Sequence, residues 1–411
     1  MIRNKPEIVS PAGNLEKLKF AVTFGADSVF FGGGMFNLRD KAGNFSPEDI
    51  SEAVEFCRTH DVKTTFLLNS FLHEKDIDAA EKYIKSIEHF DFHAVMISDP
   101  GMLQLVKNSN LKSRIYLSTQ MSTLNRLSVK FWKNQGIDRI VLARETTLKE
   151  IESIRDFSDD EIEVFVHGAL CISYSGRCLL SRFMSGRDAN LGECSQPCRW
   201  KFSLMEEKRP GHHFEFIEHA TGTEILSSKD LCLLRKIPDY INAGVNAFKL
   251  EGRMKSLYYV ANVTRIYKNI VENIIAGNSL EDKFPFWESE LDLISHRPYT
   301  DDLFNEFDDL GFRGVPYIKK VMFMGYADAV PQGNEVKVKV FNPIHLNDRL
   351  EAIAPIKNNI INDTQLTVVK IFEDDTEDVL ARPGRNCRII FDKKVPENAI
   401  FRKRILSPEG A

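Results

Sequence analysis

Eight short apolar runs alternate with helical patterns over the first 250 residues of the sequence. This alternation is typical of repeated strand-helix units that build a parallel sheet. Eight such units within residues 1–277 match the count and length of a TIM-type barrel, so we expect an α/β fold with a TIM-like (β/α)8 barrel. An open doubly wound sheet gives the same alternation and is the alternative. The expected strands are Glu7–Val9, Ser28–Phe31, Lys63–Leu68, Ala94–Ser98, Arg114–Ser118, Arg139–Leu142, Glu163–Val166 and Ala247–Leu250.

Polar residues or glycines directly follow these runs, and their placement favours the barrel. In a barrel the carboxyl ends of all strands meet at one rim, where the active site lies. We therefore expect the active site among the residues that would ring this rim. They are Ser10, Gly32, Asn69, Asp99, Gln120, Arg144, Glu145, His167, Glu251 and Arg253.

Five of these rim residues carry side chains suited to chemistry. The imidazole after the seventh strand would point at the active site, although a lone histidine is often structural. The arginines suit a planar carboxylate or phosphate, which a guanidinium binds with two hydrogen bonds. The alternative is a ring of internal salt bridges at the barrel mouth. The predicted catalytic residues are His167, Arg144, Glu145, Glu251 and Arg253.

A cysteine-rich insertion, residues 170–232, separates the seventh and eighth strands. Its first four cysteines have the spacing C-x6-C-x15-C-x3-C, and a fifth follows. The sequence has no apolar run of about 18 residues and no apolar signal segment, so we expect a cytoplasmic protein with no membrane partner. In that reducing compartment, clustered cysteines favour metal ligation or reactive thiols over disulfides.

An all-thiolate site fits an iron-sulfur cluster or zinc, although the paired C-x2-C knuckles of zinc ribbons are missing. The alternative is a set of ordinary buried thiols. Cys57 lies in a helical pattern and Cys387 in a strand pattern, and both are expected to be packing residues. The cysteines of the insertion are Cys171, Cys178, Cys194, Cys198 and Cys232.

The insertion also carries a basic excess. Between residues 171 and 201, five basic residues stand against two acidic ones, with three aromatic residues among them. Such a patch would grip RNA by phosphate contacts and base stacking, and the alternative is a solvated loop. The net charge of −5 argues against a protein that coats nucleic acid generally. The predicted RNA-binding residues are Arg177, Arg182, Arg187 and Arg199.

The C-terminal third differs from the barrel in pattern. Residues 278–316 are acidic and are expected to form an irregular connector. Residues 317–411 contain short alternating runs separated by turn signals, which predict a small all-β barrel. The expected strands are Val321–Tyr326, Glu335–Phe341, Arg349–Ile353, Leu366–Phe372, Arg388–Phe391 and Ile400–Lys403.

The usual protease motifs are missing from the sequence, which contains neither H-E-x-x-H nor G-x-S-x-G. A cysteine nucleophile such as Cys171 near His167 stays open. On this ground alone a peptidase stays an open alternative.

Several long motifs resemble those of one protein family. The run EVFVHGALCISYSGRCLLS, with RDANLGECSQPCRW, SSKDLCLL and KLEGRMKSLYYVANV after it, is similar to the signature of the peptidase U32 family, the collagenase-like protease group. SPAGNLEKLKFAV and STQMS in the first half match it too. The resemblance covers about residues 5–275, and the terminal β domain resembles the family's C-terminal module. It is nearest to the branch that hydroxylates tRNA.

This resemblance implies an RNA-modifying hydroxylase that forms 5-hydroxyuridine at the wobble position of the tRNA anticodon. It also implies a 4Fe-4S cluster, with zinc as the alternative, and prephenate as a cosubstrate. The rim arginines would hold this small carboxylate, and the insertion and β domain would receive the anticodon arm of tRNA. A non-catalytic RNA-binding protein is a further alternative. The implied ligands are Cys171, Cys178, Cys194 and Cys232, with Cys198 as an alternate.

Overall fold

The computed structural model describes residues 5–38, 44–170, 178–187, 189–191, 194–197, 217–219, 222–224, 229–301 and 318–405. These residues form two compact units. Among the described residues, the first unit lies within residues 5–22, 26–260 and 296–301, and the second within 23–25, 261–295 and 318–405. The division therefore differs from the boundary expected at residue 277, because residues 261–295 pack with the C-terminal strands.

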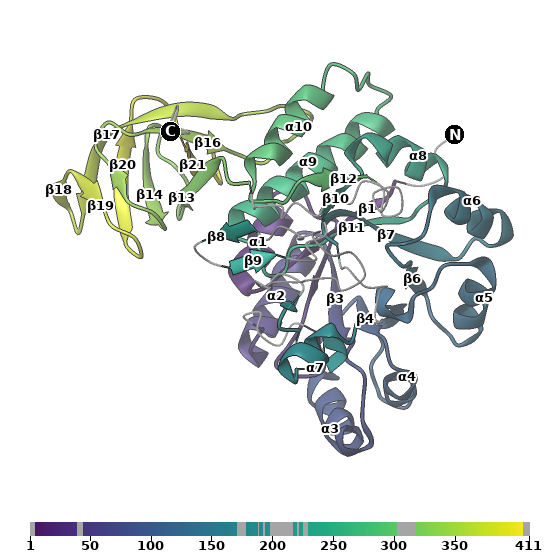
Figure 1. The fold of residues 1–411 in the computed structure, drawn as a ribbon. Coiled ribbons are helices and arrows are strands. Elements are labelled where there is room, and N and C mark those ends of the chain that lie inside the picture. Colours follow the sequence, from purple (N-terminus) through teal and green to yellow (C-terminus); the bar gives the residue numbers. More distant parts are fainter. Residues whose placement is uncertain are drawn as a thin grey trace, which may run out of the picture. The chain divides into compact units, whose positions relative to one another are not determined.

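Eight parallel strands form a closed barrel in the first unit (Figure 1). Neighbouring strands pair in sequence order from β1 to β7, and β11 pairs with both β7 and β1, which closes the ring. The expected TIM-like fold is confirmed, and each of the eight expected runs forms one barrel strand. The strands are β1 (Glu7–Pro11), β2 (Ser28–Phe31), β3 (Lys63–Leu68), β4 (Ala94–Ile97), β5 (Arg114–Leu117), β6 (Arg139–Val141), β7 (Glu161–Ala169) and β11 (Ala247–Leu250).

Helices follow the strands and surround them (Figure 1). At the N-terminus of helix α2 (Pro47–Thr59) the Ser46 hydroxyl accepts a hydrogen bond from the Asp49 amide, and the Asp49 carboxylate accepts one from the Ser46 amide. This capping box pairs amides that the first helical turn leaves without partners. None of the described helices is long and apolar enough to cross a membrane. These helices are α1 (Leu15–Thr23), α2 (Pro47–Thr59), α3 (Ile77–Ile87), α4 (Pro100–Lys107), α5 (Arg126–Asn134), α6 (Leu148–Phe157) and α8 (Ile237–Asn242), whereas α9 (Leu257–Ile275) begins in the first unit and continues in the second.

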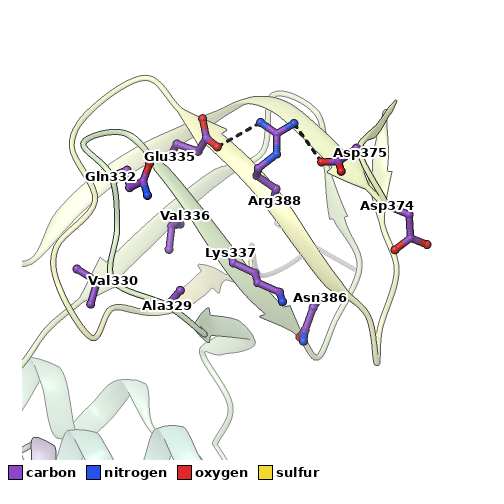
Figure 2. Close-up of a pocket in the computed structure, with 10 residues that line it drawn as sticks. All are labelled: Ala329, Val330, Gln332, Glu335, Val336, Lys337, Asp374, Asp375, Asn386 and Arg388. Carbon is purple, nitrogen blue, oxygen red and sulfur yellow. Dashed lines mark hydrogen bonds and ion pairs between the residues drawn. The ribbon is translucent and has the colours of Figure 1, made fainter.

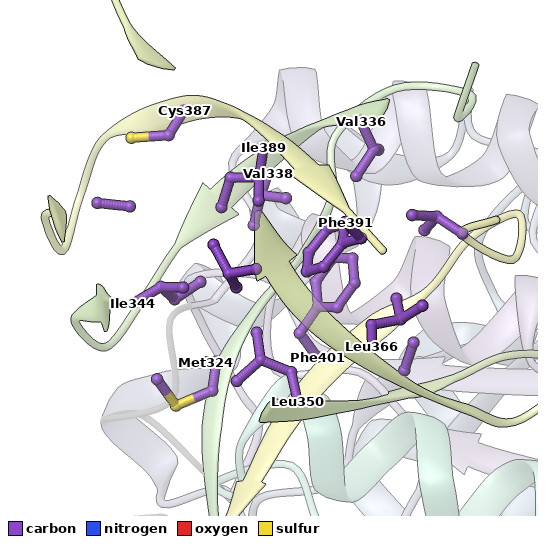
Figure 3. Packing of buried hydrophobic residues seen from close by; sticks show 14 of the residues in the cluster. Met324, Val336, Val338, Ile344, Leu350, Leu366, Cys387, Ile389, Phe391 and Phe401 are labelled. Carbon is purple, nitrogen blue, oxygen red and sulfur yellow. The ribbon is translucent and has the colours of Figure 1, made fainter. Parts of the chain in front are cut away.

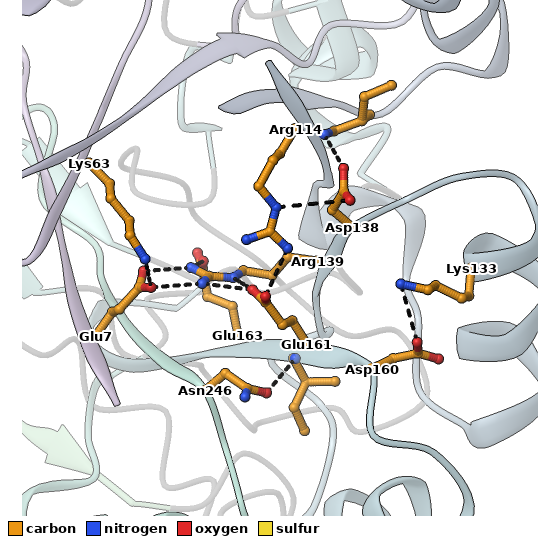
Figure 4. A network of polar contacts seen from close by, with 12 residues as sticks. Glu7, Lys63, Arg114, Lys133, Asp138, Arg139, Asp160, Glu161, Glu163 and Asn246 are labelled. Atoms are coloured by element: carbon orange, nitrogen blue, oxygen red, sulfur yellow. Dashed lines mark hydrogen bonds and ion pairs between the residues drawn. The ribbon is translucent and has the colours of Figure 1, made fainter. Parts of the chain in front are cut away.

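Charged side chains from several barrel strands meet in a buried network centred on Arg139 (Figure 4). Its guanidinium lies 2.8 Å from a Glu7 carboxylate oxygen, 2.9 Å from Glu161 and 3.5 Å from Glu163. Lys249 donates to Glu163 at 2.7 Å and lies over the Phe30 ring. Paired in this way, the charges avoid most of the cost of burial.

The insertion leaves the barrel from the end of β7. This strand continues past the barrel and pairs antiparallel with β10 (Asp230–Cys232), which in turn pairs with β12 (Tyr299–Thr300). The described part of the insertion also contains α7 (Leu180–Ser185), β8 (Ile217–His219) and β9 (Gly222–Glu224). The predicted residues Cys171, Arg177, Cys198 and Arg199 lie outside the described residues.

The segment expected as an irregular connector contains a helix, α10 (Phe284–Leu293), so that expectation was wrong for these residues. Phe284, Trp287 and Leu291 recur at helical spacing and are buried. The expectation was wrong because it rested on the acidic composition of the segment and not on the helical spacing of its apolar residues.

The second unit contains the expected closed β-barrel, which is confirmed. Six antiparallel strands close because β16 pairs with both β17 and β21, and β18 extends one edge. Alternate residues of each strand fill one apolar core, where Phe391 and Phe401 stack with 5.3 Å between ring centroids (Figure 3). The strands are β13 (Val321–Ala327), β14 (Glu335–Val340), β16 (Arg349–Ile353), β17 (Thr364–Glu373), β18 (Thr376–Asp378), β20 (Asn386–Phe391) and β21 (Ile400–Arg404).

Candidate active site at the rim of the barrel

The rim at the carboxyl ends of the strands has two different sides. Residues after β6, β7 and β11 are mostly charged or ionisable, and we call this side the charged arc. Residues after β3, β4 and β5 that face the mouth are neutral amides and hydroxyls, and we call this side the neutral arc. The charged arc comprises Arg144, Glu145, His167, Glu251 and Arg253, and the neutral arc Asn69, Ser98, Ser118 and Gln120.

His167 is 1% exposed at the end of β7. Burial lowers the pKa of its imidazole to about 3, with Lys255 and His296 acting in the same direction and Asp230 against them. The ring is therefore neutral near pH 7. It lies 5.4 Å from the Tyr299 ring and can serve as a hydrogen-bonding or proton-accepting group, but not as a standing positive charge.

Replacing this imidazole should make the free energy of unfolding depend less on pH. Below pH 6.5 the unfolded chain protonates His167 while the folded chain does not, so stability is lost as pH falls from 6.5 towards 3. Between pH 6 and pH 5, wild type should lose about 1.2 kcal/mol more than His167→Phe does. Urea unfolding at both pH values measures the difference. A second variant without a titrating group, His167→Gln, should show the same smaller pH dependence of the free energy of unfolding. An unchanged pH dependence in both variants would contradict a lowered pKa of His167.

Beside His167 lies a buried ion pair that the sequence did not predict. Arg297 donates to Asp230 Oδ1 through Nη2 at 2.7 Å and through Nε at 3.0 Å, and its backbone N–H donates to Oδ2. Lys255 Nζ lies 3.9 Å from the same carboxylate. Asp230 and Arg297 are 67 residues apart in sequence, so no local pattern connects them. The pair ties β10 to the segment that precedes β12, while backbone pairing holds β10, and with it Cys232, against the end of β7.

Arg144 and Glu251 form a second pair across the charged arc, with 3.6 Å between Arg144 Nη2 and Glu251 Oε2. The Arg144 guanidinium also lies 4.0 Å over the Phe165 ring. Gly168 allows Glu251 to come this close, because a Cβ atom there would lie 2.6 Å from the Glu251 carbonyl oxygen. The backbone φ of +111° at Gly168 is also one that glycine tolerates.

Arg253 is 3% exposed and holds the loop after β2 in place. Its two terminal nitrogens donate to the side-chain oxygens of Asn37 and Asn44, each at 3.1 Å. Asn37 in turn donates to the Gly33 carbonyl at 2.7 Å. These contacts give Arg253 a structural role in the described residues. Glu145 is buried beside Arg144 on the turn after β6.

In the neutral arc, four side chains from three neighbouring strands form one hydrogen-bonded group. Gln120 Oε1 accepts from Ser98 Oγ at 2.8 Å and from Ser118 Oγ at 3.2 Å. Asn69 Nδ2 lies 3.5 Å from both Ser118 Oγ and Gln120 Oε1. The sequence placed Asn69 and Gln120 on the rim, and the structure brings them together.

The three described cysteines of the insertion are all partly exposed. Cys232 lies directly opposite His167 on the antiparallel pair β7 and β10, so both side chains point to the same face of the sheet. Cys178 and Cys194 belong to segments that are tied together, because the Ser195 amide donates to Ser181 Oγ at 3.0 Å. Of the three, Cys232 is the thiol that lies beside an imidazole.

Within the described residues, no three His, Cys, Asp or Glu side chains are placed to hold one metal ion. Cys178, Cys194 and Cys232 are therefore not gathered around one metal position, and the cluster stays a prediction whose ligand set also includes Cys171 or Cys198, which lie outside the described residues. Cys57 and Cys387 are both fully buried, as expected of packing residues, and burial raises the pKa of both thiols.

The described part of the basic patch lies around α7. Arg182 and Arg187 are exposed, and the Phe183 side chain between them is 86% exposed. Leu179 is exposed next to them. An exposed aromatic ring flanked by arginines is an arrangement that binds single-stranded nucleic acid by stacking and phosphate contact.

A hollow of about 460 Å³ opens on the C-terminal barrel (Figure 2). Arg388 crosses it, with one terminal nitrogen 3.2 Å from Glu335 and the other 3.8 Å from Asp375. Three carboxylates and two cations line the hollow, so it does not offer the positive charge that RNA phosphates require. The basic run Arg402–Arg404 on β21 is also neutralised, since it pairs with Glu290, Glu351 and Asp348.

Residues 13–309 match the model of peptidase family U32. The chain belongs to this family. The resemblance seen in the motifs is thereby confirmed.

Three similar proteins are named for different activities. The tRNA hydroxylation protein P1 of Bacillus subtilis is 34% identical, over 98% of this chain and 96% of that protein. The 23S rRNA 5-hydroxycytidine C2501 synthase of Escherichia coli is 32% identical, over 90% of this chain and 55% of that protein. A protein of Porphyromonas gingivalis named Collagenase is 32% identical, over 72% of this chain and 73% of that protein.

Proposed function

We propose that this U32 family member is an enzyme that hydroxylates a pyrimidine base in RNA, and that its substrate is uridine at the wobble position of tRNA. The observation that carries the proposal is the 34% identity to a tRNA hydroxylation protein over nearly the full length of both chains. The exposed Arg182, Phe183 and Arg187 within the barrel insertion support an RNA substrate, because they offer phosphate contacts and a stacking surface.

In this proposal the barrel mouth receives one base from a single-stranded loop. A base that is already unpaired enters such a pocket without the cost of melting a duplex. His167 stays neutral beside the entering base and exchanges hydrogen bonds with it. Backbone pairing with β7 holds β10, and the Asp230–Arg297 pair ties it to the segment that precedes β12, so the position of Cys232 relative to His167 is set before RNA binds.

We further propose that Cys171, Cys178, Cys194 and Cys232 hold a 4Fe-4S cluster, with Cys198 as the alternate to one of them. A bound cluster would supply electron transfer at the rim. The partial exposure of the three described thiols and the link between the Cys178 and Cys194 segments support this ligand set.

A small carboxylate of the prephenate type is proposed as the cosubstrate, and Arg144 is the better placed arginine for it. The terminal nitrogens of Arg253 already donate to two asparagines, whereas Arg144 faces Glu251 at 3.6 Å, which is longer than a hydrogen bond. A ligand carboxylate could therefore take over the Arg144 guanidinium without breaking a short contact.

Mass spectrometry of total tRNA nucleosides from a deletion strain tests the proposed activity. We expect 5-hydroxyuridine and the nucleosides made from it to disappear, and to return with the wild-type gene or Cys387→Ala but not with Cys232→Ser. Protein purified without oxygen should be brown and contain about four iron atoms per chain. Unchanged tRNA nucleosides in the deletion strain would overturn the activity, and a colourless protein with one zinc would overturn the cluster.

The relative named Collagenase makes a cysteine peptidase the second candidate. A nucleophilic cysteine is usually kept as thiolate by a nearby positive charge, often an imidazolium. His167 is the histidine opposite Cys232, and burial lowers its pKa to about 3, so it does not provide that charge at neutral pH. Gelatin cleavage by the purified wild-type protein, lost in both Cys232→Ser and His167→Phe, would establish the peptidase instead.

A further inference from the structure

The side-chain amides of Asn69 and Gln120 in the neutral arc each have one polar atom that makes no hydrogen bond within the described residues. Asn69 is 8% exposed, and its Oδ1 atom is buried with no hydrogen-bond partner among the described residues. Gln120 uses Oε1 for all of its described side-chain contacts, so its Nε2 also remains available. Buried polar atoms without partners are rare in proteins and often mark a place where a ligand supplies the partner.

A ligand would therefore meet one acceptor, Asn69 Oδ1, next to one donor, Gln120 Nε2. The two amides are joined head to tail, with Asn69 Nδ2 directed at Gln120 Oε1, which leaves the Asn69 oxygen and the Gln120 nitrogen for a ligand. If both amides were turned by 180°, the pair would still offer one donor and one acceptor, with the two positions exchanged. This arc therefore matches a neutral group that carries an adjacent donor and acceptor.

The surroundings exclude a charged ligand here. Asp99 follows β4 nearby, and its carboxylate oxygens accept from the backbone amides of Met102 and Leu72. Ser98 and Ser118 complete the arc without charge. A phosphate or carboxylate would need donors only, whereas the arc offers one donor and one acceptor.

We infer that Asn69 and Gln120 read the Watson-Crick edge of a uracil base in the barrel mouth. Asn69 Oδ1 accepts from the uracil N3–H, and Gln120 Nε2 donates to uracil O4. Cytosine presents the opposite order, with an acceptor at N3 and a donor at N4, so the amides as oriented select uracil. This inference rests on the proposed function, because it names the base that the same rim receives.

The order of the strands around the barrel determines where C5 of the bound uracil points. Around the uracil ring, N3 is followed by C4, which bears O4, and then by C5. Around the rim, Asn69 after β3 is followed by Gln120 after β5, and then by the charged arc. A base bound by these two amides therefore directs C5 towards the charged arc. Thr119 Oγ1 donates to the Leu142 carbonyl at 3.0 Å. This hydrogen bond joins the turn that contains Gln120 to the loop that contains Arg144.

Binding of short single-stranded RNA by the purified full-length protein tests the inference without any need for turnover. The probes are fluorescent pentanucleotides AAXAA in which X is uridine, cytidine or 3-methyluridine, the last of which lacks the N3–H. Wild type should bind the uridine probe about tenfold more tightly than the other two. Asn69→Ala and Gln120→Ala should abolish this preference, while the affinity for the 3-methyluridine probe stays unchanged.

Gln120→Glu replaces the donor to uracil O4 with an acceptor and should remove the uridine preference, without creating a cytidine preference because Asn69 Oδ1 still faces the N3 position. Gln104→Glu, on the exposed side of α4, makes the same chemical change away from the rim and should keep the uridine preference. Asn69→Ala removes a buried acceptor without a partner but also the two long contacts of Nδ2, so its midpoint of thermal unfolding should fall only slightly and the variant should stay folded in the binding assay. That measurement separates lost recognition from lost folding.

Equal affinity of wild type for all three probes, or a uridine preference that survives in Gln120→Ala, would overturn the inference. These outcomes are distinct from a failure of the proposed function. A deletion strain with unchanged tRNA nucleosides would reject the activity, while a uridine preference that depends on Asn69 and Gln120 would still assign this arc to base reading.

Discussion

Replacing Arg139 with methionine is expected to lower the free energy of unfolding by about 3–5 kcal/mol, because it breaks a buried ion-pair network by removing one side. The Arg139 side chain is 2% exposed and contacts Glu7, Glu161 and Glu163. Without it, Lys63, Arg114 and Lys249 still pair with Glu7, Glu161 and Glu163, but each of the three carboxylates loses one of its cations. Urea unfolding at pH 7 measures the loss. An exposed pair, Arg58 with Glu55, provides the control, and Arg58→Met should leave the unfolding midpoint unchanged.

The same variant should show a characteristic pH dependence. Burial alone would raise the pKa of Glu7, but hydrogen bonds and charge from Arg139 and Lys63 bring it down to about 2, from 4.5 in an unfolded chain. The stability that Glu7 contributes is thus present above pH 4.5 and is lost as pH falls towards 2. In Arg139→Met much of that contribution is already missing, so the difference from wild type should shrink below pH 4.5. A difference that grows on acidification would contradict this account of the network.

The barrel could be predicted from the sequence because its signals are local. Each strand is a short apolar run, and each rim residue directly follows one, so position along the chain gives position on the rim. Asn69, Gln120 and His167 were placed on the rim in this way. The C-terminal barrel was predictable for the same reason, since its strands alternate and are separated by turn residues.

The remaining features depend on contacts between residues far apart in sequence. Nothing near Asp230 indicates that Arg297 will pair with it, and nothing near Arg253 indicates that Asn37 and Asn44 will take its donors. Arg253 holds a loop through these contacts, and its predicted ligand-binding role stays a prediction. Similarly, the apolar face of α10 was hidden because an acidic composition does not reveal which side of a helix is buried.

Residues 261–295 contact the C-terminal residues of the second unit at several points, and one of these contacts is an Arg-Glu-Arg cluster. Glu290 Oε2 accepts from Arg265 Nη2 at 2.7 Å and from Arg402 Nη1 at 2.8 Å, and Oε1 accepts from Arg402 Nη2 at 2.7 Å. Although burial alone would raise the pKa of Glu290, hydrogen bonds and charge from the two arginines lower it, so the carboxylate is ionised at neutral pH. The cluster joins α9, α10 and β21.

Glu290→Gln should therefore destabilise the second unit by about 3–5 kcal/mol, because it leaves two buried guanidinium groups without their shared anion. In addition, one side-chain oxygen becomes an NH2 group that must face N–H donors. Urea unfolding followed by the fluorescence of Trp287, which is buried on the same helix, measures the change. Asp292→Asn is the control on α10, where the exposed pair with Lys320 should be worth no more than about 1 kcal/mol.

A double-mutant cycle with Arg402→Leu separates the cluster from a general effect on α10. The arginine substitution should cost less in the Glu290→Gln background than in wild type, since its main partner is already gone. Purely additive costs, or a loss in Glu290→Gln no larger than in Asp292→Asn, would show that the cluster does not hold residues 261–295 to the C-terminal strands.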